Sequence, residues 1–310
     1  MGPLAPERDA GRGLDGGGFP QARHGRGGAA RHGPRLAGRP LSQDPALLRG
    51  RARPLLVGRA RGPRGPRGGR ALRAAGVIAA GLGQRLKDSH PGVPKPLVPV
   101  AGRPLAHWVV SGLLAAGVER VTVLLNSRGD AAREALERGF PGRVAFLRAD
   151  PPTSFDSFRL VAAHLARTET AFLMSTVDAL VPPAEVRRFA AAALSPFPDG
   201  AVPEAAVALT RYIDDEKPLW TATDPTGRVS AFGDAVVRRD AVTCGLYALT
   251  AGAAATLPPT AARLRDWWSS LPAAGRPVRG VLLSDTVDVD RPEDLPAAER
   301  LAAALLKEAA

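Results

Sequence analysis

Two glycines and two basic side chains lie close together in one stretch of the chain. Gly81 and Gly83 belong to the segment 79–86, which reads AAGLGQRL, and Lys95 follows in the triplet PKP. Glycine leaves no side chain in the way where backbone N–H groups must approach an anion closely. Arg85 and Lys95 add the positive charge that neutral amides lack. These residue types at this spacing predict a phosphate-binding loop.

Carboxylates occupy two other places where a cation could bind. Asp178 directly follows the apolar run AFLMSTV, which we interpret as a buried strand, and ligands of open α/β sheets gather at the carboxyl ends of such strands. Asp288 and Asp290 alternate with valines in TVDVDRPEDL, so a strand would present both on one face. Carboxylates are ligands of hard cations such as Mg²⁺. A second interpretation of Asp178, as the cap of a helix that begins near Pro182, stays open.

Two other glycine-rich phosphate sites fit the loop less well. A dinucleotide-binding turn needs a third glycine where Leu86 stands, with a helix that begins at the glycines, and three prolines follow instead. A P-loop needs Gly-Lys-Ser/Thr at its end, and this triplet is absent from the segment. A plain strand-to-loop turn with solvated Arg85 and Lys95 remains open.

The elements around these residues alternate between strand and helix. Apolar β-rich runs and amphipathic segments succeed each other from residue 75 onward. Strands separated by helices predict a mostly parallel sheet with helices on both faces, that is, a Rossmann-like α/β fold. The expected strands are 75–78, 118–126, 144–147 and 171–175, and the expected helices are 105–116, 130–138, 154–166 (capped by Ser154 or Asp156) and 182–194.

The pattern changes after Pro203. The turn 224–227, DPTG, separates two short β-rich runs, 220–223 and 228–232, and predicts a β-hairpin. Further strands are expected at 206–210, 242–249, 278–283 and 285–290, with a helix at 260–271 and a C-terminal helix that begins at Pro292. We expect the strand 285–290 to rejoin the main sheet, and we interpret Glu293 and Asp294 as acids that favour the first turn of the last helix.

The glycine-rich segment and the segment PKPLVPVAGRPL, residues 94–105, together resemble the signature of the sugar-nucleotidyltransferase superfamily, which includes NDP-sugar pyrophosphorylase-like and MobA-like NTP transferases. The segment 288–295 resembles the superfamily's DVDTPEDL ending, with Arg291 in place of the usual threonine. The resemblance covers about residues 75 to 300. It implies a GT-A-type fold in which the hairpin insertion binds the acceptor.

The resemblance also implies roles for particular residues. Arg85 and Lys95 would be catalytic, and Asp178 and Asp290 would hold a catalytic Mg²⁺ with Asp288 beside them. The nucleotide would contact Ala80, Gly81, Gly83, Thr153 and Ser154. The superfamily's usual Gly-Thr pair is missing beside Thr153, so the sequence leaves the base open.

The activity implied is transfer of a nucleotidyl group from an NTP to a phosphorylated small-molecule acceptor, with release of pyrophosphate. A sugar 1-phosphate is the first expectation for the acceptor. Two alternatives remain open: a cytidylyl- or guanylyltransferase that acts on a polyol phosphate, phosphocholine or molybdopterin, and a nucleotide-binding regulator without turnover.

The positive charge of the chain is confined to its first segment. Residues 1–73 contain 16 Arg, no Lys and four acids, whereas residues 74–310 contain 26 basic and 26 acidic side chains. With so few large apolar residues, 1–73 is predicted to be disordered and 74–310 to be the transferase domain. The first segment is a basic tail attracted to RNA or membranes, a linker, or an extension translated from a misplaced start codon.

The composition also excludes some classes of partner and site. A balanced charge over 74–310 gives no reason to expect a nucleic-acid-binding surface. A single cysteine, Cys244, excludes an intrachain disulfide framework and fits a cytoplasmic location. No run reaches the roughly 18 apolar residues of a membrane span, so we expect no membrane partner.

Overall fold

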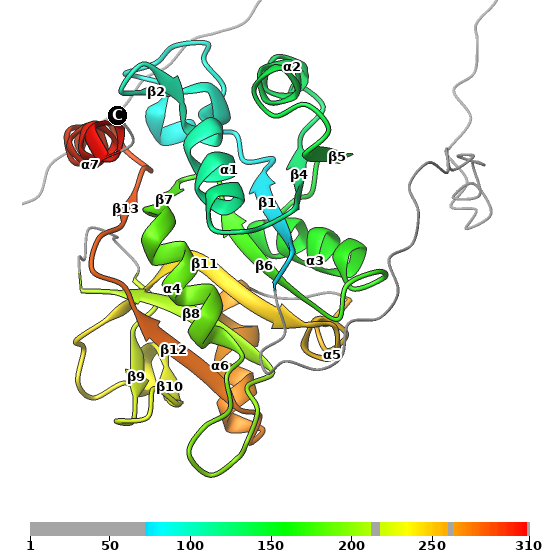
Figure 1. Ribbon diagram of the computed structural model, residues 1–310, viewed down its shortest axis with the longest axis vertical. Helices are drawn as coiled ribbons and strands as arrows, with labels where there is room; N and C mark the ends of the chain where they lie inside the picture. The colour runs from blue at the N-terminus through cyan, green and yellow to red at the C-terminus, as the bar shows by residue number, and fades with distance from the viewer. Residues whose placement is uncertain (1–71, 212–217, 260–262, 309–310) are drawn as a thin grey trace, which may run out of the picture. The chain divides into compact units, whose positions relative to one another are not determined.

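A seven-stranded sheet forms the centre of the computed structural model, which describes residues 72–211, 218–259 and 263–308 (Figure 1). The strand order is β12-β8-β11-β6-β1-β4-β5. Neighbours run parallel except where β11 pairs with β6 and β8, so the sheet is mostly parallel, as predicted. The strands are β1 (Ala74–Ala79), β4 (Arg120–Leu125), β5 (Val144–Arg148), β6 (Ala171–Thr176), β8 (Ala205–Thr210), β11 (Val242–Thr250) and β12 (Val278–Leu282).

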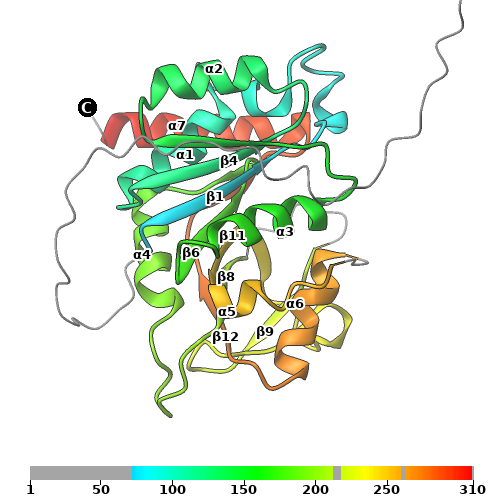
Figure 2. The ribbon, with the colours of Figure 1, turned by 90° about the vertical axis from the view of Figure 1, so that its right-hand side faces the viewer.

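Helices cover both faces of the sheet. One face packs against α1 (Leu105–Ala115), α2 (Asp130–Gly139) and α4 (Pro183–Ala193). The other packs against α3 (Ser154–Leu165), α5 (Ala251–Ala254) and α6 (Leu264–Ala273). Figure 2 shows α2 and α3 on opposite sides of β1 and β4. The predicted α/β architecture is therefore confirmed.

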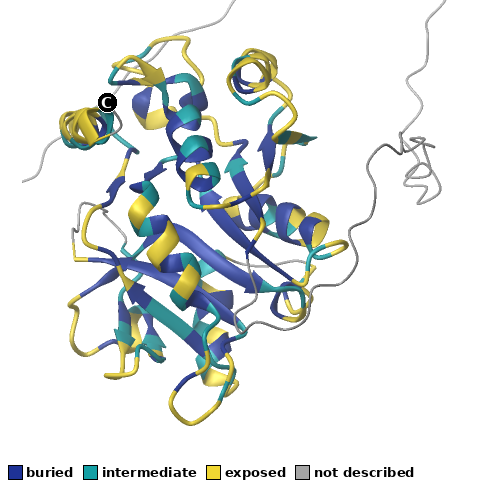
Figure 3. Cartoon of the chain, viewed as in Figure 1, coloured by how far each residue is buried: buried dark blue, intermediate teal, exposed yellow. Residues whose placement is uncertain are grey.

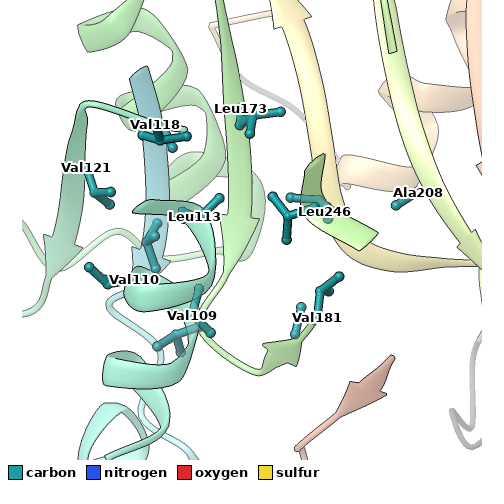
Figure 4. Close-up of a cluster of buried hydrophobic side chains, with 14 of the residues drawn as sticks. Val109, Val110, Leu113, Val118, Val121, Leu173, Val181, Ala208 and Leu246 are labelled. Atoms are coloured by element: carbon teal, nitrogen blue, oxygen red, sulfur yellow. The ribbon is translucent and has the colours of Figure 1, made fainter. Parts of the chain in front are cut away.

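Burial on both faces explains why the central strands are continuous apolar runs. Every residue of β8 is buried, and only one residue each of β1 and β6 is not (Figure 3). A close-up of one core cluster shows side chains of α1 beside those of the sheet, with Val109, Val110, Leu113, Val121 and Leu173 labelled (Figure 4). Parallel strands covered on both sides have no solvent-facing row of polar residues.

Three two-stranded sheets flank the main sheet. The predicted hairpin is formed by β9 (Thr221–Thr223) and β10 (Val229–Phe232). The hairpin β2 (Pro99–Val100) and β3 (Arg103–Pro104) leads into α1. The third sheet pairs β7 (Ala179–Leu180) with β13 (Val287–Asp288).

The prediction that 285–290 rejoins the main sheet is wrong. The strand in this segment, β13, has only two residues and pairs with β7, the short strand just after Asp178. Val287 and Val289 are buried with Leu180 against the C-terminal helix α7 (Leu295–Glu308), which forms a separate apolar cluster. This cluster, rather than the main sheet, determines where the segment packs.

Several predicted boundaries also differ. Thr153, and neither Ser154 nor Asp156, caps α3, because its side chain accepts a hydrogen bond from the Asp156 N–H. Helix α6 begins at Leu264, whereas part of the expected helix, residues 260–262, lies outside the described residues. The last helix starts with a 3-10 turn, Pro292–Asp294, and the short helix α5 was not predicted.

The predicted disordered segment also lies almost entirely outside the described residues, which begin at Leu72. Leu72 is buried in the core, and the Arg73 carbonyl accepts a hydrogen bond from the Glu119 N–H. Within the described ranges, no helix is long and apolar enough to cross a membrane.

Candidate active site

The glycine-rich segment leaves the carboxyl end of β1. Later strands of the chain lie on both sides of β1, with β4 and β5 on one side and β6 on the other. It forms one 3-10 turn at Gln84–Leu86, and a second follows at Lys95–Leu97. Gly83 has a φ of 57°, and a Cβ placed on it would lie 2.7 Å from the Lys95 Cβ. A Cβ on Gly81 would meet no atom within 4 Å. Gly83 therefore allows the loop to pack against Lys95, whereas Gly81 keeps space open beside it.

Asn126 holds the start of this loop and was missed by the sequence analysis. Its Nδ2 donates to the Ala80 carbonyl oxygen over 3.0 Å. The sequence does contain a signal for this role, because Asn126 directly follows β4. Strand β4 pairs parallel with β1, so the two strands end at the same edge of the sheet.

Lys95 lies between two of the predicted carboxylates. Its Nζ donates to Asp178 Oδ2 over 2.5 Å and also to Asp290 Oδ1. The Lys95 residue is only 7% exposed. The tertiary structure thus brings together three of the predicted site residues, from the glycine-rich region, the end of β6 and the segment after β13.

The charges in this cluster stabilise one another. Burial opposes the charge on Lys95, but the carboxylates of Asp178 and Asp290 outweigh it and raise the Lys95 pKa above its ordinary value. Burial likewise opposes ionisation of Asp178, but the Lys95 ammonium outweighs it and keeps the Asp178 pKa below its ordinary value. The cluster is therefore an ion pair between one ammonium and two carboxylates.

Asp290 is held in place by two further contacts. Arg85 Nη1 lies 3.3 Å from Asp290 Oδ2. The buried Asp294 carboxylate accepts hydrogen bonds from the backbone N–H groups of Asp290 and Arg291, over 2.8 and 2.7 Å. Asp294 is therefore more than an acid near a helix N-terminus: it fixes the backbone that presents Asp290.

Asp288, the third predicted carboxylate, lies on β13 opposite Ala179. Its side chain remains exposed to a pocket, but the protein that surrounds the carboxyl group disfavours the charged form. Desolvation of the carboxyl group by the surrounding protein, together with the neighbouring carboxylates of Asp178 and Asp290, raises the Asp288 pKa well above its ordinary value. No hydrogen bond of Asp288 to Lys95 is present, so Asp288 belongs to the edge of the cluster.

The loop that carries Asp178 packs closely against a bulge in β11. Pairing of β11 with β8 shifts register between Thr243 and Tyr247, and Gly245 within this bulge has a φ of 73°. A Cβ on Gly245 would lie 2.3 Å from Thr176 Oγ1 and 2.9 Å from the Ala179 Cβ. Only glycine fits here, so the bulge packs directly against the loop that carries Asp178.

Two pockets meet at Arg85 and Asp290. The larger, of about 470 Å³, extends from the glycine-rich loop past Lys95 and Asp178 to Thr153 and Ser154. It contains all the residues predicted to bind nucleotide: Ala80, Gly81, Gly83, Thr153 and Ser154. The smaller pocket, of about 50 Å³, lies toward β11 and β13 and is lined by Thr210, Val242, Thr243, Cys244, Thr286, Asp288 and Arg291, among others.

The family model of the MobA-like NTP transferase domain matches residues 75–254, more than half of the chain. The chain belongs to this family. The prediction of a nucleotidyltransferase from the glycine-rich and C-terminal motifs is confirmed at the level of the family. The match contains the predicted phosphate loop and Asp178, and it ends before the segment that carries Asp290.

Two curated relatives of this NTP transferase domain are longer than this chain. The chain is 29% identical over 235 residues to a "Bifunctional IPC transferase and DIPP synthase" of Rubrobacter xylanophilus, a match that covers 73% of this chain and 51% of that protein. It is 32% identical over 156 residues to a "CMP-5'-(3-aminopropyl)phosphonate synthase" of Streptomyces rubellomurinus, over 46% of this chain and 24% of that protein. The chain therefore spans about half the length of the first of these relatives and less of the second.

The fold is also that of solved nucleotidyltransferase structures. The inositol-1-phosphate CTP transferase from T. maritima superposes with a TM-score of 0.63 at 18% identity, over 75% of this chain and 97% of that one. A UTP-bound UGPase from Acinetobacter baumannii superposes with a TM-score of 0.57 at 18% identity, over 74% and 93%. The expected GT-A-type, Rossmann-like fold is thus confirmed.

The carboxylates of the NTP transferase domain also fit the donor set of a magnesium site. Asp178 Oδ1 is buried without a hydrogen-bond partner, and Mg²⁺ is commonly held by one or two carboxylates together with substrate phosphates. Among the described residues, no group of three or more His, Cys, Asp or Glu side chains is arranged to hold a metal ion. A cation on Asp178 and Asp290 would therefore depend on oxygens supplied by the substrate or by water.

Proposed function

We propose that this chain transfers a nucleotidyl group from an NTP to a phosphorylated small-molecule acceptor and releases pyrophosphate. The observation that carries the proposal is the junction of two pockets at Arg85 and Asp290. Such a junction allows the donor and the acceptor to approach the same charged residues from opposite sides. Membership of the NTP transferase family supports the reaction class.

In this proposal the larger pocket binds the NTP. Backbone N–H groups around Gly81 and Gly83 bind its phosphates, and the space beside Gly81 lets the phosphates approach the backbone closely. Arg85 and Lys95 neutralise the charge that develops on the phosphate oxygens as the bond forms. Thr153 and Ser154 border the end of the pocket where we place the base.

The acceptor binds beside the smaller pocket, which shares Arg85 and Asp290 with the larger one, and its phosphate oxygen attacks the α-phosphorus of the NTP. Because a phosphate is already an anion at neutral pH, the attack needs no general base. Positioning and charge neutralisation carry the reaction. Mg²⁺ bound to Asp178 and Asp290, when present, would neutralise the triphosphate and orient it. Asp294 and Arg85 keep Asp290 in the orientation that this role requires.

A sugar 1-phosphate is the acceptor we propose first, with a phosphorylated polyol or a phosphonate as the second candidate. The names of two curated relatives favour the phosphonate: the Streptomyces synthase above and a "2-aminoethylphosphonate cytidylyltransferase" of Lancefieldella rimae. The same names make CTP the first donor to test. We place the reaction in the cytoplasm, where NTPs and phosphorylated acceptors are available.

The experiment that tests the proposal is a screen for pyrophosphate release. Each of the four NTPs is combined with a panel of sugar 1-phosphates, polyol phosphates and aminoalkylphosphonates, with Mg²⁺ and with EDTA. We expect release that depends on one NTP, on one acceptor and on the metal. Absence of release across the whole panel would contradict the proposed reaction.

Lys95→Ala provides the first variant. It should lower turnover by about 100-fold or more, the scale for loss of one charged contact to the transition state. Lys87→Ala is the matched control, because Lys87 is an exposed lysine in the same region of chain, at the end of the first 3-10 turn, whereas Lys95 begins the second. Equal turnover of the Lys95 and Lys87 variants would indicate that Lys95 has a structural role and no catalytic one.

A further inference from the structure

The Lys95 ammonium occupies the place that a cation shared by Asp178 Oδ2 and Asp290 Oδ1 would take. Asp178 Oδ2 lies 2.5 Å from Nζ, and Asp290 Oδ1 lies no farther from it. The two oxygens are therefore at most about 5 Å apart. Oxygens that share one Mg²⁺ lie about 4 Å apart or closer, because each is about 2.1 Å from the metal. A metal on these two oxygens would overlap the ammonium nitrogen.

The charges of the cluster lead to the same conclusion. Asp178 and Asp290 carry two negative charges, and Lys95 and Arg85 carry two positive charges in contact with them. A divalent cation added to this set alone would leave two positive charges in excess in a partly buried site, which is unfavourable without further compensation. The triphosphate of an NTP carries several negative charges and would supply that compensation.

The backbone and Cβ of Lys95 are closely packed, so a change in the position of its ammonium requires rotation about the outer bonds of the side chain. The backbone is held between Pro94 and Pro96 in a 3-10 turn, and Gly83 packs against the Lys95 Cβ. The side chain also borders the larger pocket, next to Gly81, Gly83 and Arg85. Rotation about its outer bonds would carry the ammonium from the carboxylates to the space where the proposed function places the phosphates.

We propose that Lys95 and the divalent cation compete for Asp178 and Asp290, so that the metal binds only together with the nucleotide. Lys95 is the counter-ion of the two carboxylates until the triphosphate draws its ammonium away, and the metal then takes its place. This inference rests on the proposed function for the identity of the nucleotide, but the competition itself involves only side chains of this chain. Its consequence is that the metal–nucleotide complex, rather than the free metal, is the species that the enzyme binds.

The direct test is binding of Mn²⁺ alone, followed through the electron paramagnetic resonance signal of free Mn²⁺, without nucleotide or acceptor. Lys95→Met keeps a straight side chain of similar length and removes the competing charge. We expect it to bind Mn²⁺ at least about tenfold more tightly than the wild type. Lys87→Met, the control, should bind like the wild type. Equal affinities of the wild type and the Lys95 variant would overturn the proposal.

A second measurement uses the wild type alone and remains decisive if the Lys95 variant does not fold. The melting temperature is recorded with millimolar MgCl2, with each NTP, and with both. We expect no shift with MgCl2 alone and a rise with MgCl2 and at least one NTP. A rise with MgCl2 alone would overturn the competition.

The two proposals fail in different ways. If no NTP with MgCl2 changes the melting temperature and no pyrophosphate is released, the proposed function is contradicted. The Mn²⁺ comparison between the wild type and the Lys95 variant still reports on the competition in that case, because it requires neither substrate.

Discussion

Replacing Gly83 by alanine tests whether the backbone of the phosphate loop places Lys95. A residue other than glycine at a φ of 57° costs about 1 kcal/mol or more. The added Cβ would lie 2.7 Å from the Lys95 Cβ, whereas carbon atoms pack at about 3.5–4 Å, so one of the two segments must move by about 1 Å. Overpacking of this kind costs about 1–3 kcal/mol. We therefore expect the free energy of unfolding to fall by about 2–4 kcal/mol.

Turnover of the Gly83 variant should also fall. A shift of about 1 Å in a charged group at the reacting centre costs about 100-fold in rate. Gly81→Ala is the matched control, because a Cβ there meets no atom within 4 Å and the φ of Gly81 is not positive. It should change the free energy of unfolding by less than about 1 kcal/mol. Its methyl group would enter the space proposed for the phosphates, so the KM for the NTP should rise.

Urea unfolding of both variants, with pyrophosphate release at saturating NTP, provides the measurement. The reasoning is refuted if Gly83→Ala unfolds at the wild-type urea concentration and turns over at the wild-type rate. A Gly83 variant that loses stability but keeps full turnover would show that the position of Lys95 does not depend on this contact.

The remaining predictions concern the carboxylates and the cysteine. Asp178→Asn and Asp290→Asn should each lower turnover by about 100-fold or more, and the double variant should be little worse than either because the two act as a unit. Asp88→Asn, at an exposed loop position, is the control. Additive losses of turnover in the double variant would contradict the shared role of Asp178 and Asp290. Asp294→Ala should lower the free energy of unfolding by about 1–3 kcal/mol, measured in urea, because two backbone N–H groups lose a charged acceptor. Burial raises the pKa of Cys244 to about 12, so thiol reagents at pH 8 should modify it rapidly only after unfolding; rapid modification of the folded protein would contradict this placement.

The sequence by itself determined the fold class and predicted the phosphate loop. Alternating apolar runs and amphipathic segments indicate a parallel sheet covered by helices, because each signal depends on local periodicity. The spacing of Gly81, Gly83, Arg85 and Lys95 indicates an anion site for the same reason, since all four lie within one short stretch of chain. The resemblance to the superfamily added the expected partners of these residues.

Tertiary packing decided the rest of the site. Val287 and Val289 pack against α7 and Leu180, which sends the segment before Asp290 to β7 instead of the main sheet. A two-residue periodicity predicts a strand but does not indicate which other strand it pairs with. Pairing depends on which apolar clusters the two strands share.

The same limit applies to the charged residues. Nothing in the local sequence distinguishes Asp294 as the acceptor that fixes Asp290 from an ordinary acid in a first helical turn. Likewise, the sequence predicts a phosphate loop that contains Lys95 and places Asp178 after a strand, but only the fold brings the ammonium between the two carboxylates. Residues this far apart in the chain come into contact only through the packing of the helices and strands that carry them. The local sequence around each residue therefore does not reveal these contacts.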